Sequence, residues 1–429
     1  MLFRSHVGSD ETYELGTCEV CKAKAAEIGK SGLYLLFVNK VAQHLKSSRR
    51  QVMVWERPMG WETSSSPSIG VLPQKGLALT ESYDEKPDFT FAKKAKSLGY
   101  KVYAYDPNPG IEHLFLPYLY KEEDDGTKTA GCLENSYRFL TSLPSTGLFD
   151  GIISTSWDDS GLHNQVWMLR FVAAAAFSWN GREPKPDEFR GSYFKTYYGP
   201  NATNMNELFQ LMNEGSYYYM STLERKVWHW GEIGKTHLPD LPRGDALEYN
   251  PFWNKAYGDM VQRSNVLQEK MQQALRIIEG NLKSGVRHDY DFEVFRTIVQ
   301  LIAHTAETYK DLSELENLIT KAHKAHYENH ALTYQYLEKA LALVKNSLAR
   351  REMVFNELVT AWEKTRLPKG MSTKEKKYFF QQDRARHFAN RTPDMNYLVV
   401  DEQKLDLEGY VQKLGEYMGY YKGAYLQGK

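Results

Sequence analysis

Cysteine is scarce in this chain, with three residues, Cys18, Cys21 and Cys132, among 429. An odd and sparse set is a poor framework for disulfide bonds, and it is compatible with a reducing compartment. Cys18 and Cys21 have C-x-x-C spacing, but a zinc site needs a second pair of ligands at a suitable spacing, and none is evident in the sequence. We therefore expect no metal or other cofactor, and we expect these two cysteines to be small residues that open a helix.

Long apolar runs and an excess of charge are also missing. The longest apolar candidate, around residues 172–177, is far too short for the run of about 20 residues that spans a bilayer. Lysine and arginine together number 54, as do aspartate and glutamate, so net charge provides no attraction to nucleic acid or to an anionic membrane. We therefore expect neither nucleic acid nor a membrane as a partner, and a neutral substrate fits this balance better.

The first part of the chain, residues 1–181, alternates short β-rich runs with helical ones, which is typical of parallel β/α units. Five strands are expected, at residues 2–8, 51–56, 76–83, 100–106 and 149–157. The segments between them are helices or loops at 22–46, 57–75, 89–98 and 133–143, and a further helix at 163–179 closes the set.

The ends of these strands favour one kind of α/β fold. No glycine-rich phosphate loop follows the first strand, as a doubly wound nucleotide-binding sheet would have. Polar and aromatic residues cluster instead where the strands end, which favours a (β/α)8 TIM-type barrel. A barrel needs eight strands, so the expected barrel lacks its first three units, which would precede Met1.

The remainder of the chain reads as a connector with helices, followed by an all-α helical domain. Prolines and glycines punctuate residues 182–250, and the helical patterns follow within 251–429, at 261–280, 292–312, 315–326, 331–349 and 352–365. Their apolar residues recur at spacings of three and four, so the helices are expected to pack as a bundle. His323, His326 and His330 fall on one helical face without an identifiable acidic or cysteine partner, so we expect them to be solvated.

The chemistry is concentrated in an H-x-G-x-D-E run at residues 6–11, which ends in Asp10 and Glu11. Retaining glycosidases usually place two carboxylates about 5–5.5 Å apart on either side of the scissile bond. Neighbours in sequence do not ordinarily flank a sugar ring that way. The adjacent pair indicates another division of labour, in which one acid protonates the leaving oxygen while its neighbour steers a nucleophile that the substrate carries, such as a 2-acetamido group.

This run resembles the H-x-G-G-D-E signature of family 20 glycoside hydrolases, the β-N-acetylhexosaminidases, with Ser9 in place of a glycine. The resemblance implies that Glu11 is the general acid/base and that Asp10 holds and polarises the acetamido N–H. It also implies a tyrosine that hydrogen-bonds the acetamido oxygen, for which Tyr105 is the choice. His6 either orients Asp10 or is a core histidine with satisfied hydrogen bonds.

Two further strand ends are similar to the family's elements. Trp55-Glu56 ends the second strand, and Trp157 ends the fifth, followed two residues later by Asp159. The resemblance implies that the tryptophans wall the pocket for the acetamido methyl, that Asp159 binds sugar hydroxyls and that Glu56 is also a substrate-binding residue. The family's tryptophan on the intervening strand is missing, and Trp61, Glu81 and Tyr83 are candidates to replace it.

The sequence therefore predicts an exo-acting β-N-acetylhexosaminidase, with retaining, substrate-assisted hydrolysis of terminal N-acetylglucosamine or N-acetylgalactosamine from a glycan or glycoconjugate. One alternative is a non-catalytic carbohydrate-binding or scaffold protein with an incomplete barrel. Another is a barrel hydrolase whose carboxylates have a different geometry. Hydrolysis that does not depend on the 2-acetamido group would distinguish this last possibility.

Overall fold

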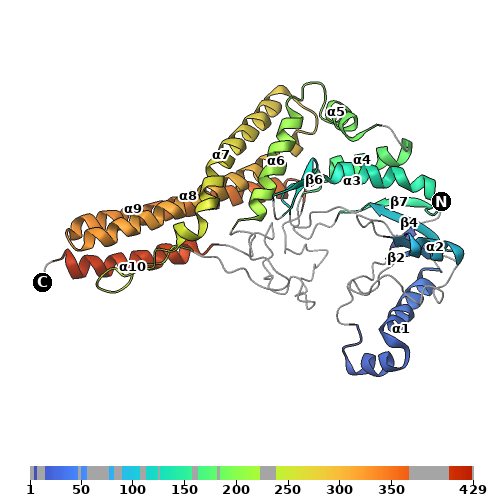
Figure 1. Ribbon diagram of the computed structural model, residues 1–429, viewed down its shortest axis with the longest axis horizontal. Coiled ribbons are helices and arrows are strands. Elements are labelled where there is room, and N and C mark those ends of the chain that lie inside the picture. Colours follow the sequence, from blue (N-terminus) through green and yellow to red (C-terminus); the bar gives the residue numbers. More distant parts are fainter. Residues whose placement is uncertain are drawn as a thin grey trace. The chain divides into compact units, whose positions relative to one another are not determined.

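The computed structural model (Figure 1) describes eleven segments: residues 4–6, 15–46, 50–55, 77–81, 89–106, 113–123, 126–156, 163–180, 184–222, 238–366 and 405–427. The chain divides into two compact units. The first comprises residues 1–109, 130–157 and 168–189, and the second comprises 110–129, 158–167 and 190–429. Segments 110–129 and 158–167, which the sequence analysis assigns to the barrel domain, thus belong to the second unit. The boundaries expected at 181 and 250 stay predictions.

A parallel sheet forms the first unit. Its strands are β1 (Arg4–His6), β2 (Gln51–Trp55), β3 (Leu77–Glu81), β4 (Lys101–Asp106) and β7 (Gly151–Ser154). They lie in the order β1-β2-β3-β4-β7, and each neighbouring pair is parallel. The five expected strands are confirmed. Each lies beside its predecessor, whereas a doubly wound sheet reverses its order at a switch point. The described sheet has five strands, so the closed eight-stranded barrel stays a prediction.

Helices cover one face of that sheet. They include α1 (Glu19–Lys46) and α2 (Thr90–Ser97), while α3 (Cys132–Ser142), the short 3-10 helix η2 (Leu143–Thr146) and α4 (Met168–Asn180) follow β4 and β7 in the chain. Because side chains alternate along a strand, Val52, Val54 and Val102 point to the same face. They pack there with buried residues of α1 and α2. The opposite face of the sheet carries Met53, Tyr103 and Ile153.

The second unit is mainly helical. Its helices are α5 (Pro186–Tyr197, which begins in the first unit), α6 (Met205–Met220), α7 (Trp253–Ser284), α8 (Asp289–His326), α9 (His330–Glu363) and α10 (Leu407–Tyr425). A short 3-10 helix, η3 (Asn164–Val166), and a two-stranded ribbon, β5 (Tyr120–Glu122) with β6 (Lys128–Ala130), complete the described elements. After residue 251 the described elements are all helices, and a separate helical domain at 251–429 stays a prediction.

Two expected helix breaks are wrong. The helices expected at 292–312 and 315–326 form the single helix α8, and those expected at 331–349 and 352–365 form α9, which ends at Glu363. Neither break contains glycine or proline, since Ser-Glu occupies 313–314 and Arg-Arg occupies 350–351. Leu312 and Leu315 lie in the same buried cluster on either side of the first supposed break. Figure 1 shows α8 and α9 as long continuous helices.

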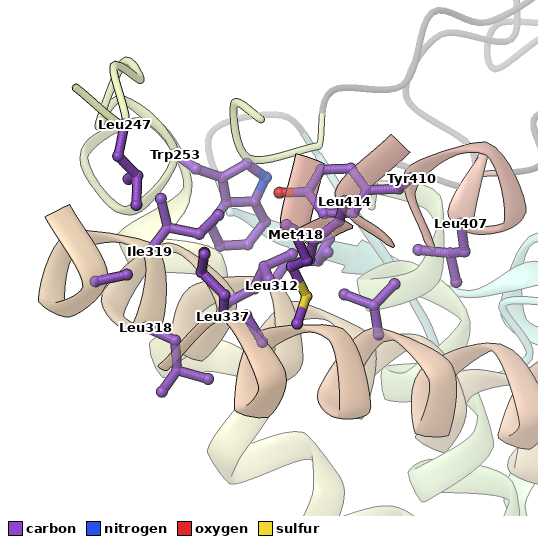
Figure 2. Close-up of a cluster of buried hydrophobic side chains, with 14 of the residues drawn as sticks. Leu247, Trp253, Leu312, Leu318, Ile319, Leu337, Leu407, Tyr410, Leu414 and Met418 are labelled. Atoms are coloured by element: carbon purple, nitrogen blue, oxygen red, sulfur yellow. The ribbon is translucent and has the colours of Figure 1, made fainter. Parts of the chain in front are cut away.

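One hydrophobic core cluster of the helical region lies between α7, α8, α9 and α10 (Figure 2). Trp253 and Ile319 are fully buried there, with Leu337 and Leu414. The Glu316 carboxylate accepts hydrogen bonds from the backbone N–H groups of Trp253, at 2.6 Å, and Asn254, at 2.9 Å. Those N–H groups open α7 and have no partner within the helix, so a buried carboxylate from α8 satisfies them.

The expectation that the three histidines are solvated is wrong. His326 is buried, and its Nδ1 lies 2.9 Å from the Tyr421 hydroxyl of α10, which also lies 3.0 Å from Nδ1 of His330. His323 Nδ1 lies 3.0 Å from the carbonyl oxygen of Leu247. These partners are at least 76 residues away in sequence, so helical spacing alone gives no indication of them.

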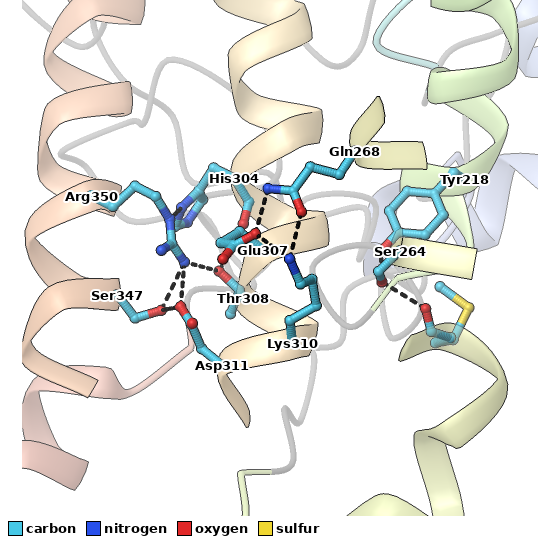
Figure 3. A network of polar contacts seen from close by, with 11 residues as sticks. Tyr218, Ser264, Gln268, His304, Glu307, Thr308, Lys310, Asp311, Ser347 and Arg350 are labelled. Carbon is cyan, nitrogen blue, oxygen red and sulfur yellow. Dashed lines mark hydrogen bonds and ion pairs between the residues drawn. The ribbon is translucent and has the colours of Figure 1, made fainter. Parts of the chain in front are cut away.

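A polar network joins α8 to α9 (Figure 3). Arg350 donates from Nε to Nδ1 of His304 at 3.0 Å and from Nη2 to Asp311 at 2.6 Å, while Ser347 donates to the same carboxylate oxygen at 2.9 Å. Burial, together with the charges of Arg350 and Arg351, lowers the pKa of His304 to about 3. His304 is thus neutral and accepts the arginine's hydrogen bond.

Candidate functional site

Three of the residues expected in the site lie together in the structure. His6 ends β1, Trp55 ends β2, and Tyr105 lies next to the end of β4. The ring centroids of His6 and Trp55 are 4.4 Å apart, and those of Trp55 and Tyr105 are 5.0 Å apart, with the latter two rings edge to face at 70°. The three side chains form a continuous aromatic row, residues 6, 55 and 105, across the carboxyl ends of the sheet.

Strand register explains why this row forms. His6 pairs with Met53, so Trp55, two residues further along β2, has its side chain on the same face. Thr80 of β3 pairs with Trp55 on one side and with Tyr103 on the other, so Trp55 and Tyr103 lie on the same face of the sheet. Tyr105 follows Tyr103 by two residues along β4 and therefore also lies on that face. This is the face that carries Met53 and Tyr103, away from the cluster formed with α1 and α2.

The aromatic row is accessible. His6 is exposed, and Trp55 and Tyr105 are half-buried. Aromatic rings in a row offer flat apolar surfaces, while the tyrosine hydroxyl and imidazole nitrogens supply polar groups at their edges. Such a surface suits a ligand that has apolar C–H faces and polar hydroxyl or amide groups, as a sugar ring does.

A buried ion pair supports the end of β4 behind Tyr105. Arg170 of α4 lies 2.7 Å from the Asp106 carboxylate, and the Ser136 hydroxyl of α3 donates to its other oxygen at 2.8 Å. Arg170 also donates to the carbonyl oxygen of Cys132. Burial raises the pKa of the Asp106 carboxyl, and Arg170 and Ser136 oppose that rise. At the end of β4, Tyr105 thus lies on the accessible face while the adjacent Asp106 joins the strand to α3 and α4.

Sequence reasoning missed Arg170 and Ser136 as residues that position the row. Arg170 lies in an otherwise apolar helix, Met-Leu-Arg-Phe-Val-Ala, and a single charge inside an apolar run is the signal that a buried partner exists. That signal does not identify the partner. Asp106 is 64 residues away.

The other expected site residues lie outside the described residues. These are Asp10, Glu11, Glu56, Trp157 and Asp159, together with the substitute wall candidates Trp61 and Tyr83. Glu81 belongs to β3, but its side chain is also outside the description. Along the chain, Asp10 follows the last residue of β1 by four positions, and Trp157 follows the last residue of β7 by three. Their roles stay predictions.

The helical unit has clefts of its own. One, of about 300 Å³, lies between the β5–β6 ribbon and helices α6 and α7, where Tyr120 and Tyr217 stack at 6.1 Å and Glu214 pairs with Lys270 at 2.7 Å. Within the described segments, no group of three or more histidine, cysteine, aspartate or glutamate side chains is arranged to hold a metal ion. In those same segments, no helix combines the length and apolarity needed to cross a membrane.

Comparisons with known proteins assign no family. No family model matches the sequence, and no curated protein matches it. Among solved structures, the chain is similar to a GH138 enzyme targeting pectin rhamnogalacturonan II, at 12% sequence identity and a TM-score of 0.41. The match covers 88% of this chain and 47% of that one, so the chain spans about half the length of that protein. A likeness at this identity and score does not assign a function.

Proposed function

We propose that the chain is a glycoside hydrolase, an exo-acting β-N-acetylhexosaminidase that cleaves terminal N-acetylglucosamine or N-acetylgalactosamine by a retaining, substrate-assisted mechanism. The observation that carries this proposal is the aromatic row His6–Trp55–Tyr105 at the carboxyl ends of three parallel strands. Asp10 and Glu11 follow the first of these strands in the chain. Parallel β/α barrels present their catalytic groups at that same edge.

In this proposal the sheet is part of a TIM-type barrel that occupies residues 1–181. The sequential strand order supports it, because a barrel is built by adding each strand beside the previous one. The covered face, with α1 and α2, corresponds to the outer side of a barrel wall, and the face with Met53 and Tyr103 corresponds to its interior.

The proposed reaction has two steps. Glu11 donates its proton to the glycosidic oxygen while the acetamido oxygen of the substrate attacks the anomeric carbon, and the leaving group departs as an alcohol. Asp10 accepts a hydrogen bond from the acetamido N–H, which becomes more acidic as the ring forms, and the Tyr105 hydroxyl donates to the acetamido oxygen. Glu11 then takes a proton from water, which opens the intermediate with net retention of configuration.

The remaining residues of the site bind the sugar. Trp55 and Trp157 enclose the acetamido methyl, and a nucleophile held against the anomeric carbon reacts with a high effective concentration. Glu56 and Asp159 accept hydrogen bonds from ring hydroxyls. His6, in contact with Trp55, fixes the orientation of that ring or of Asp10.

The test is Glu11→Gln, assayed with a nitrophenyl N-acetyl-β-glucosaminide and with the matching plain β-glucoside. We expect the wild-type chain to cleave only the acetamido substrate and the variant to lose about 100-fold or more in kcat. Glu188→Gln is the matched control, since Glu188 ends a second Asp-Glu pair in the first turn of α5 and is exposed.

Other outcomes identify the alternatives. Binding of N-acetylglucosamine without turnover by the wild-type chain would support a non-catalytic carbohydrate-binding protein. Equal rates on the two substrates would point to a barrel hydrolase of different geometry. A Glu11→Gln variant that retains most of its activity would contradict the assignment of the acid.

A further inference from the structure

Two cysteines begin the helix that connects the first two parallel strands. Cys18 is exposed and directly precedes Glu19, the first residue of α1, while Cys21 is half-buried in the first turn. The Cys21 backbone N–H donates to the Cys18 sulfur at 3.3 Å. This bond holds the Cys18 side chain against the first turn of α1, which also carries Cys21, whereas Cys132 is buried within α3.

We propose that Cys18 and Cys21 form a thiol–disulfide exchange site, with Cys18 as the attacking thiol and Cys21 as the resolving one. The ligand class is a small disulfide such as oxidised glutathione. This activity is separate from sugar hydrolysis and uses none of the residues assigned to it.

The fold around the pair supports an exchange role. Strand β1, helix α1 and strand β2 form a β-α-β unit with parallel strands. A C-x-x-C at the start of the helix in such a unit is an arrangement in which a dithiol undergoes redox exchange. The backbone N–H groups at a helix start stabilise the thiolate form that attacks a disulfide.

The two thiols differ in the way that the proposed roles require. The hydrogen bond from Cys21 lowers the pKa of the Cys18 thiol, and the same bond raises the pKa of the Cys21 thiol. Cys18 is also the more exposed of the two. The more exposed thiol is thus also the one whose thiolate form is favoured, as the attacking role requires.

The exchange balances without any further reactant. The Cys18 thiolate attacks one sulfur of oxidised glutathione, the glutathione S–S bond breaks, and one glutathione leaves and takes up the proton that Cys18 released. Cys21 then loses its proton and attacks the Cys18 sulfur of the mixed disulfide, and the second glutathione leaves with a proton. Two protein thiols are oxidised to one disulfide, and one glutathione disulfide is reduced to two thiols.

The experiment incubates the full chain in buffers of increasing ratio of oxidised to reduced glutathione. Each sample is quenched with acid, and its peptides are identified by mass spectrometry. We expect a disulfide between Cys18 and Cys21 that forms and reverses with the ratio, while Cys132 stays a free thiol. In Cys21→Ser the reaction should stop at glutathione on Cys18, and in Cys18→Ser the modification of Cys21 should be slower.

Two results would overturn the proposal. One is a chain that keeps all three thiols free at every ratio, including in oxidised glutathione alone. The other is equal modification of the two serine variants, which would show that the cysteines react as independent surface thiols. Circular dichroism of both variants checks that the fold is retained, as expected for substitutions at accessible positions, and Cys132→Ala serves as the control that leaves the exchange unchanged.

Discussion

The two units hold comparable arginine–carboxylate pairs in different surroundings. In the first unit Arg170 and Asp106 are 2.7 Å apart with side chains 2% and 1% exposed, and in the second Arg350 and Asp311 are 2.6 Å apart with side chains 25% and 13% exposed. The distances are nearly the same, so the geometry of contact does not distinguish the pairs. Burial distinguishes the two pairs, because a buried charge that loses its partner is not solvated by water, which makes the loss of that partner strongly destabilising.

The largest effect is expected from Arg170→Met. Methionine has similar length but no charge, so the variant leaves the Asp106 carboxylate buried without its cation, and we expect a loss of about 3–5 kcal/mol in the free energy of unfolding. Urea denaturation measures it. The double variant Arg170→Met with Asp106→Leu should recover most of the loss, and a double variant as unstable as the single one would mean that packing, not charge, is responsible.

The next effect depends on pH and belongs to the second unit. His304 has a folded pKa of about 3, below the ordinary 6.5, so as pH falls below 6.5 the unfolded chain takes up a proton that the folded chain does not. Stability is therefore lost on acidification. His304→Asn keeps an acceptor for Arg350 without this titration.

The difference in unfolding free energy between His304→Asn and wild type should shift in favour of the variant by roughly 3 kcal/mol between pH 6.5 and pH 4. Asp291, whose burial raises its pKa to about 7, gives the opposite trend, since stability is lost as pH rises toward 7. That contribution is common to both proteins and cancels in the comparison. Parallel stability curves for the two proteins would contradict the prediction.

A smaller effect is expected from Arg350→Met. The Asp311 carboxylate keeps the Ser347 hydroxyl and has access to water, so we expect a loss of about 1–2 kcal/mol. The measurement is the same urea titration as for Arg170→Met. Equal losses for the two methionine variants would break the comparison, because they would show that burial does not set the effect.

The smallest effect is expected on the surface of the first unit. Arg138 and Glu134 are 2.8 Å apart on α3 with side chains 65% and 38% exposed. We expect Arg138→Gln to cost about 0.3–0.5 kcal/mol at low salt and less at high salt, where screening weakens the pair. A loss as large as that of Arg350→Met would indicate that exposure does not order the three pairs.

The sequence predicted the regular elements well where a local period specifies them. Alternating and β-rich runs located all five strands of the sheet, and the three- and four-residue spacing of apolar residues located the helical stretches of α7, α8 and α9. The helix α10 was not expected. The row of residues 6, 55 and 105 also follows from sequence, because parallel strands bring their carboxyl ends to one edge.

Contacts between distant parts of the chain were not predictable. Nothing near His326 in sequence indicates Tyr421, and nothing near Arg170 indicates Asp106. Helix breaks were expected at 313–314 and 350–351, yet both helices continue there. Ser313 donates to Asn254 of α7, and Arg350 donates to Asp311 of α8. Contacts between residues far apart in the sequence decide whether the helix continues at these positions, and a short stretch of sequence does not contain that information.

Because α8 is one continuous helix, insertions and deletions within it are expected to be poorly tolerated. The helix carries Asp291 in its first turn, the network around His304 and Asp311 in its middle, and Leu315 and Ile319 in the core near its end. Each residue turns a helix by about 100°. Inserting or deleting one residue between Asp311 and Leu315 would therefore turn one end away from its partners while the other stays in place. We expect length variation to be better tolerated at 327–329, the turn between α8 and α9.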